Sequence, residues 1–219
     1  MTESTAAEGP SDAANPFDTI RRIPLSDPTV GELTFDVATA GPDDGEPVLL
    51  LHGFPQSYDA WQPITPLLTA AGLRVIAPDQ RGYSPDARPD GVEAYTIEHL
   101  VDDVIGILDA YDVTQAHVVG HDWGASVAWA LAAHHPDRVA TLTAVSVPHL
   151  AAFGHALATD PDQQSRSRYI SAFREHGRAE EALLADDGRR FRAMFAGHVP
   201  EALVDAHWRR HGSGGGLTA

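Results

Sequence analysis

The stretch Ala116-His117-Val118-Val119-Gly120-His121-Asp122-Trp123-Gly124-Ala125 decides the fold of this chain. It opens with a short apolar run that does not alternate, which is typical of a strand buried on both faces, and it leads directly into a helical pattern over 123–134. Glycines before and after Asp122 let a strand and a helix approach closely around one exposed residue. The stretch therefore predicts a nucleophile elbow with Asp122 as the nucleophile. The alternative is a tight turn without a catalytic role, and the buried strand and Ala-rich helix that flank the turn argue against it.

The sequence on either side of this stretch alternates between strands and helices. Because apolar strand segments alternate with helical ones, the sequence predicts an α/β fold with a mostly parallel, doubly wound sheet and flanking helices. The strand signals stop after Pro148, and the remaining sequence predicts helices and loops. The predicted strands are 48–51, 73–77, 116–119 and 139–147, the predicted helices are 58–70, 96–111 and 123–134, and a predicted β-hairpin spans 21–37.

Composition excludes several classes of protein. Acidic residues outnumber basic ones by 31 to 15, and the formal net charge of −16 repels phosphate backbones, so no nucleic-acid partner is expected. Cysteine is absent, which excludes disulfides and thiolate metal sites, and no apolar window is long enough to span a membrane. The first sixteen residues predict a disordered tail rather than a signal peptide, so a cytoplasmic location is expected. We expect a tail at 1–16, a sheet-forming part at 17–147 and a helical part at 148–219.

Three further motifs lie where strands of the predicted sheet end. They are His52-Gly53-Phe54-Pro55, Asp79-Gln80-Arg81-Gly82-Tyr83-Ser84 and Ser146-Val147-Pro148-His149. Together with the elbow they resemble the α/β-hydrolase superfamily, and within it the epoxide hydrolases and haloalkane dehalogenases that use an Asp nucleophile. The resemblance implies an α/β-hydrolase fold in which the backbone N–H groups of Phe54 and Trp123 form an oxyanion hole, with His52 in the same oxyanion and substrate-binding loop. It also implies that 17–147 is the N-terminal part of the core and that 148–219 is a partial helical cap.

Haloalkane dehalogenases and epoxide hydrolases differ in the leaving group that the enzyme must stabilise. A carboxylate attacks an sp³ carbon and becomes an alkyl ester, whose carbonyl is then attacked by water. The related dehalogenases hold a halide with a tryptophan beside the nucleophile and a side-chain donor in the oxyanion loop; Trp123 is present, but Phe54 offers no such donor. The segment Tyr169–Glu180 resembles the epoxide-hydrolase cap motif whose first tyrosine protonates the opened ring, and a phenol with a pKa of about 10 can do this at neutral pH.

The sequence thus favours an epoxide hydrolase with Asp122 and Tyr169 as catalytic residues, a small apolar epoxide and water as substrates, and no cofactor. One alternative gives Tyr169 only a packing role against Phe173. A second is a haloalkane dehalogenase. A third, from another class, is a non-catalytic pseudo-hydrolase that binds an apolar ligand or a partner protein.

In this superfamily an acid and a histidine follow the nucleophile after later strands, which the 219 residues do not reach. We therefore expect an incomplete form that is alkylated on Asp122 without turnover, with an uncovered sheet edge that favours a homodimer.

Two groups of polar residues are expected to have no role in the site. The scattered histidines, His207 and His211 among them, show no ligand spacing, so they predict solvated or capping side chains and no metal site. Asp102 and Asp103 lie on the polar face of the predicted helix at 96–111 and are expected to be solvated.

Overall fold

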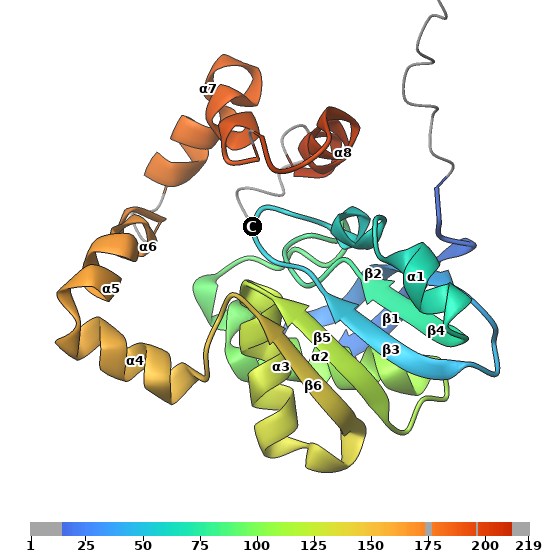
Figure 1. The fold of residues 1–219 in the computed structure, drawn as a ribbon. Helices are drawn as coiled ribbons and strands as arrows, with labels where there is room; N and C mark the ends of the chain where they lie inside the picture. The colour runs from blue at the N-terminus through green and yellow to red at the C-terminus, as the bar shows by residue number, and fades with distance from the viewer. Residues whose placement is uncertain (1–14, 174–176, 196, 212–219) are drawn as a thin grey trace, which may run out of the picture.

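Six strands form one sheet, in the order β1-β2-β4-β3-β5-β6, within residues 15–173, 177–195 and 197–211, which the computed structural model describes (Figure 1). The tail predicted at 1–16 lies mostly outside these residues, and the Gly-rich 212–219 lies wholly outside them. The strands are β1 (Thr19–Asp27), β2 (Gly31–Ala40), β3 (Glu46–Leu51), β4 (Leu73–Pro78), β5 (Ala116–His121) and β6 (Val139–Val145).

The pairing confirms the mostly parallel sheet. Strands β3, β4, β5 and β6 run parallel to one another. The hairpin β1–β2 pairs from Thr19 opposite Thr39 to Asp27 opposite Gly31, and β2 runs antiparallel to β4. Turn chemistry at the tip explains this register, because the Asp27 carboxylate accepts the N–H groups of Thr29 and Val30 at 2.8 and 3.2 Å.

The helices follow the predicted periodicity, with one break. Helix α3 spans the predicted residues, and Thr96 stands at the N-cap position of α2. The prediction of a single helix at 58–70 is wrong, because the structure has two separate helices there, η1 and α1. Pro63 lies between them and lacks the N–H that a continuous helix would need. The helices of the core are η1 (Tyr58–Trp61), α1 (Thr65–Ala70), η2 (Val92–Tyr95), α2 (Ile97–Ala110), α3 (Trp123–His134) and η3 (Pro136–Arg138).

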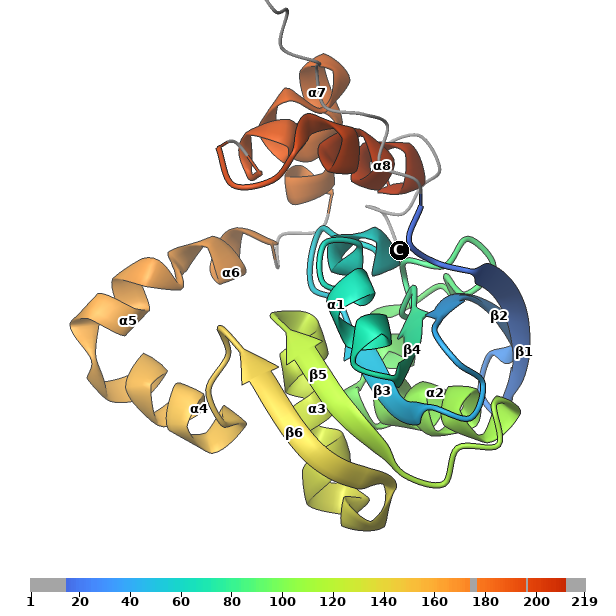
Figure 2. The same ribbon diagram turned by 45° about the vertical axis from the view of Figure 1, so that its right-hand side comes forward.

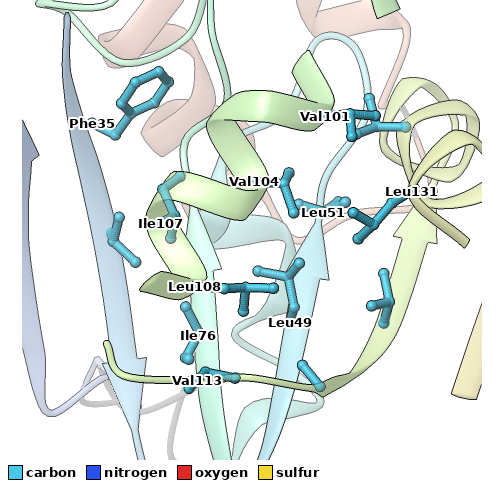
Figure 3. Packing of buried hydrophobic residues seen from close by; sticks show 14 of the residues in the cluster. Phe35, Leu49, Leu51, Ile76, Val101, Val104, Ile107, Leu108, Val113 and Leu131 are labelled. Carbon is cyan, nitrogen blue, oxygen red and sulfur yellow. The ribbon is translucent and has the colours of Figure 1, made fainter. Parts of the chain in front are cut away.

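Two apolar clusters lie on opposite faces of the sheet. On one face, α2 and α3 pack against inward-facing residues of the strands (Figure 3), and the labelled members of this cluster are Phe35, Leu49, Leu51, Ile76, Val101, Val104, Ile107, Leu108, Val113 and Leu131. On the other face, η1 and α1 cover Val48, Leu50, Val75 and Ala77. Since successive side chains of a strand point to opposite faces, the unbroken apolar runs of β3 and β4 supply both clusters.

The crossovers define where a site forms. From β3 the chain passes through α1 to β4 on one side, and from β4 it returns through α2 to β5 on the other side of β3. The loops after β3 and β5 therefore leave neighbouring strands toward opposite faces of the sheet. A crevice at the carboxyl ends of such strands is the usual ligand site of an open α/β sheet.

Helices follow β6 in the described residues, in agreement with the helices and loops that the sequence predicts after Pro148. Helices α4 (Leu150–Thr159), α5 (Pro161–Arg166) and α6 (Arg168–Phe173) lead away from the β6 edge, and α7 (Arg178–Ala193) and α8 (Glu201–His211) return above the carboxyl ends of the strands (Figures 1 and 2). Within α7, residues Ala185 to Gly188 depart from helical geometry and kink the helix. No helix in the described part of the chain is long and apolar enough to cross a membrane.

Candidate active site

Asp122 forms the sharp turn between β5 and α3. Its backbone lies at φ 52° and ψ −120°, a region that costs an L-residue about 1–3 kcal/mol. A Cβ on Gly120 would lie 2.3 Å from the Gly124 carbonyl oxygen, and a Cβ on Gly124 would lie 2.2 Å from that of Leu51. Both glycines are therefore required by the close approach of strand, helix and neighbouring loop. The turn has the geometry that the sequence predicts for a nucleophile elbow.

The loop after β3 brings a backbone donor to the Asp122 carboxylate. The Phe54 N–H donates to Asp122 Oδ1 at 2.9 Å. A Cβ on Gly53 would lie 2.4 Å from Asp122 Cβ, so only glycine allows this approach. Trp123 is the first residue of α3, where the helix itself offers no acceptor to the backbone N–H. A negative charge that develops on this carboxyl group would meet the Phe54 donor already in place.

His52 supports this loop from within the protein. Its side chain is fully buried, its Nε2 accepts the Gln80 N–H at 3.2 Å, and its carbonyl oxygen accepts the Gln80 side-chain amide at 2.5 Å. Its ring packs edge-on against Tyr83, with ring centroids 4.6 Å apart. Burial lowers the pKa of His52 to about 3, which keeps Nε2 available as an acceptor. His52 thus ties the loop after β3 to the loop after β4.

Gln56 ties the same loop to the elbow. Its Oε1 lies 3.0 Å from His121 Nδ1, and its backbone N–H donates to the Gly53 carbonyl oxygen at 2.8 Å. His121 directly precedes Asp122. The donor loop is thereby attached to β5 by a side-chain contact as well as by the Phe54 hydrogen bond.

A row of aromatic side chains links the elbow to α6. The rings of Phe54 and Phe173 are 5.4 Å apart, and those of Phe173 and Tyr169 are 5.8 Å apart, both edge to face. Tyr169 is 56% exposed and Trp123 57% exposed, so both side chains reach solvent. The structure brings Asp122 and Phe54 into contact, and it joins Tyr169 to them through Phe173.

The buried carboxylate of Asp79 and the phenol of Tyr83 lie next to this loop. Burial raises the pKa of Asp79 to about 7, although the Arg210 guanidinium, with Nη1 3.1 Å from Asp79 Oδ2, opposes that rise. Burial also raises the pKa of Tyr83, and the negative charges of Asp122 and Asp79 add to the effect. The Tyr83 hydroxyl therefore stays protonated at neutral pH.

Two predictions about polar residues are wrong. His207 and His211 are 0% and 1% exposed rather than solvated, because α8 docks that face on the loop after β3. Asp103 is buried rather than solvated, since its carboxylate accepts hydrogen bonds from Arg81 at 2.7 and 2.8 Å. His207, Arg210 and His211 have i, i+3 and i+4 spacing, which indicates that they share one face of a helix. The sequence does not indicate which part of the chain covers that face.

No metal centre is evident in the part of the chain that the structure describes, where no three His, Cys, Asp or Glu side chains gather as possible ligands.

Comparison with protein families places this arrangement in a known context. Residues 46–209 match the family described as the alpha/beta hydrolase fold. Epoxide hydrolase A of Mycobacterium tuberculosis (strain ATCC 25618 / H37Rv) is 42% identical over 179 residues, which cover 79% of this chain and 54% of that protein. The AB hydrolase superfamily protein YfhM of Bacillus subtilis (strain 168) is 40% identical over 155 residues, covering 71% and 54%. The chain thus spans about half the length of these curated relatives.

Solved structures of proteins named epoxide hydrolases have a similar fold. Epoxide hydrolase A from Mycobacterium thermoresistibile superposes with a TM-score of 0.73 at 30% identity, over 91% of this chain and 73% of that one. The F128A mutant of an epoxide hydrolase from Bacillus megaterium, in complex with a naphthyloxy-propanediol product, superposes with a TM-score of 0.79 at 26% identity, over 90% and 70%. The chain therefore belongs to the alpha/beta-hydrolase fold family, and it is similar there to proteins named epoxide hydrolases.

Proposed function

We propose that this chain carries the nucleophile of an epoxide hydrolase, with the helices after Pro148 acting as part of its cap. The observation that supports this most directly is the Asp122 carboxylate at the tip of a strained elbow, with Oδ1 bound to the Phe54 N–H at 2.9 Å. Holding one carboxylate oxygen leaves Oδ2 as the atom free to attack. A carboxylate fixed in this way suits displacement at an sp³ carbon.

In the first step Asp122 Oδ2 forms a bond to one epoxide carbon while the bond from that carbon to the ring oxygen breaks. The ring oxygen takes the phenolic proton of Tyr169, which gives a hydroxyalkyl ester on Asp122 and a phenolate. In the second step water attacks the ester carbonyl carbon of Asp122 while a general base, which is not among the residues named above, takes a proton from it. The negative charge forms on the carbonyl oxygen, where the N–H groups of Phe54 and Trp123 would stabilise it. The bond from this carbon to the alkoxy oxygen then breaks, and the product leaves as a diol once that oxygen has taken up a proton, which restores the Asp122 carboxylate.

An epoxide fits this site better than a haloalkane does. Phe54 projects a ring, which packs against Phe173, and so it offers no side-chain donor to a departing halide. An opened epoxide stays attached to the product and needs a proton instead of a halide pocket. The relatives named epoxide hydrolases support the same choice.

Ester formation can be tested without turnover. The purified chain is incubated with styrene oxide, and its intact mass and peptide map are recorded. We expect a gain of one epoxide on Asp122, no gain in Asp122→Asn, and normal labelling in Asp102→Asn, a matched change on the exposed face of α2. A folded wild-type chain without label on Asp122 would overturn the proposal. Bromide release from a bromoalkane without epoxide labelling would favour a dehalogenase.

A further inference from the structure

Helix α8 forms hydrogen bonds with consecutive residues of the loop after β3. His207, Arg210 and His211 are three and four residues apart, so they share one face of the helix. His211 Nε2 lies 2.7 Å from the Gln56 carbonyl oxygen, and His207 Nδ1 lies 2.9 Å from Ser57 Oγ. Both histidines are almost completely buried. This face of α8 is therefore occupied by the loop.

Arg210 continues these contacts at the next two residues, Tyr58 and Asp59, which begin η1. Its Nε donates to Asp59 Oδ2 at 2.8 Å, its Nη2 donates to the Tyr58 hydroxyl, and its guanidinium lies 4.1 Å from the Tyr58 ring centroid. Its Nη1 also donates to Oδ2 of Asp79. The other carboxylate oxygen of Asp79, Oδ1, accepts the Tyr58 N–H at 2.7 Å. Arg210 thus binds the loop both directly and through a carboxylate that holds the loop backbone.

The start of the same loop is also in contact with these helices. The Phe54 side chain packs against an apolar cluster of α7, α8 and the chain between them, which contains Leu183, Phe191, Phe195 and Val204. Its backbone N–H is the donor to Asp122 Oδ1. The segment 54–59 therefore contacts α7 and α8 at both ends, in addition to its contacts with His121 of β5 and with Asp79 after β4.

We propose that α8 positions the Phe54 N–H against Asp122, with Arg210 as the positioning residue. This inference rests on the proposed function, because the N–H is taken as the donor that orients the nucleophile and later meets the oxyanion. A donor is effective only when its supporting contacts hold it in place before the reaction. Multidentate, charge-assisted hydrogen bonds from one guanidinium restrict a loop more strongly than neutral contacts do.

The test combines hydrogen exchange with labelling by styrene oxide. In Arg210→Met we expect the amides of Phe54 and of Gln56 to Asp59 to exchange about tenfold faster at neutral pH, while the amides of β5 keep their rates. We expect Asp122 labelling per folded molecule to slow by a similar factor. Arg210→Lys retains the charge without the fork and should lie between wild type and Arg210→Met. Arg166→Met, which removes an exposed ion pair with Asp162, is the matched control and should change neither rate.

Equal exchange at Phe54 in folded Arg210→Met and wild type would overturn the inference. If Arg210→Met does not fold, His211→Leu removes the contact with the Gln56 carbonyl oxygen and must show the same local loss of protection. A wild-type chain that forms no adduct defeats the proposed function, and the exchange rates then still decide whether α8 holds the loop. Faster exchange throughout the sheet in Arg210→Lys would mean a general stabilising role and would also overturn the inference.

Discussion

At Asp122 the strain of the backbone and the projection of the carboxylate from the turn have the same cause. A φ of 52° turns the chain from β5 into α3 within one residue, which leaves the side chain at the tip of the turn. The carboxylate is then close enough for the Phe54 N–H to reach it. Small residues around the turn make this packing possible, because strand, helix and loop backbones would otherwise collide.

Gly120→Ala tests that packing. The new Cβ would meet the Gly124 backbone at 2.3 Å, which no side-chain movement relieves, so we expect a loss of about 2–4 kcal/mol in the free energy of unfolding. Urea denaturation followed by circular dichroism measures it. Gly154→Ala on α4 is the control: it has open space around its Cβ position and should be neutral or stabilising by about 0.5–1 kcal/mol. Equal stabilities of the two variants would show that the elbow can relax.

Tyr169→Phe separates a proton donor from a packing residue. The substitution keeps the ring contact with Phe173 and removes only the hydroxyl. If the phenol protonates the opening ring, Asp122 labelling by styrene oxide should slow by about 10²-fold or more. Labelling at the wild-type rate would leave Tyr169 with the packing role alone. Melting temperature serves as the control, since it should be unchanged in either case.

At the scale of elements, Arg81 joins three segments that are distant in sequence. Its guanidinium binds Asp103 of α2, Asp27 at the end of β1 and the Ala94 carbonyl oxygen of η2. The Arg81 and Asp103 side chains are almost fully buried. Loss of Asp103 would leave the Arg81 guanidinium with Asp27 as its carboxylate partner and would remove two of its hydrogen bonds, which is costly where water cannot replace them. The loop after β4 is thereby held against α2 and the hairpin.

Asp103→Ala should therefore destabilise the fold by about 2–3 kcal/mol. Asp102→Ala, one residue earlier on the exposed face of the same helix, should change the free energy of unfolding by no more than about 0.5 kcal/mol. Thermal or urea denaturation of the two variants side by side gives the comparison. A loss below about 1 kcal/mol for Asp103→Ala would mean that the pair roughly balances its own desolvation.

These elements also show how far the sequence can predict the molecule. The strands, α3 and the turn at Asp122 are predictable because each depends on local periodicity and on glycines next to one another in sequence. The break at Pro63 had a local signal that the helical pattern outweighed. The burial of Asp103 and the docking of α8 could not be predicted, since each depends on partners far away along the chain. His207 pairs with Ser57 across 150 residues, and Arg81 pairs with Asp103 across 22.

At the scale of the whole molecule, three buried histidines lie where α8 meets the core. Burial lowers the pKa of His52 to about 3, of His207 to about 4 and of His211 to about 3. The positive charge of Arg210 lowers all three further, while Asp59 opposes the shift at His207. The folded chain therefore keeps these imidazoles neutral at a pH where the unfolded chain, with histidine pKa values of about 6.5, takes up protons.

This difference makes the fold sensitive to mild acid. Between pH 6 and 5 each buried histidine lowers the free energy of unfolding by about 1 kcal/mol per pH unit, because the unfolded state binds the extra proton. Asp79 acts in the opposite direction, since its pKa of about 7 lets the folded state bind a proton first. The effects of three histidines and one carboxyl group add up to a net loss of about 2 kcal/mol in the free energy of unfolding for each unit by which the pH falls. Urea denaturation at pH 7, 6 and 5 would measure this loss. His211→Leu should reduce that slope by one histidine's share, whereas His155→Leu on exposed α4 should leave it unchanged. This prediction would be wrong if the free energy of unfolding stayed constant or rose as the pH falls from 7 to 5. The buried histidines at the α8 junction would then accept protons in the folded state.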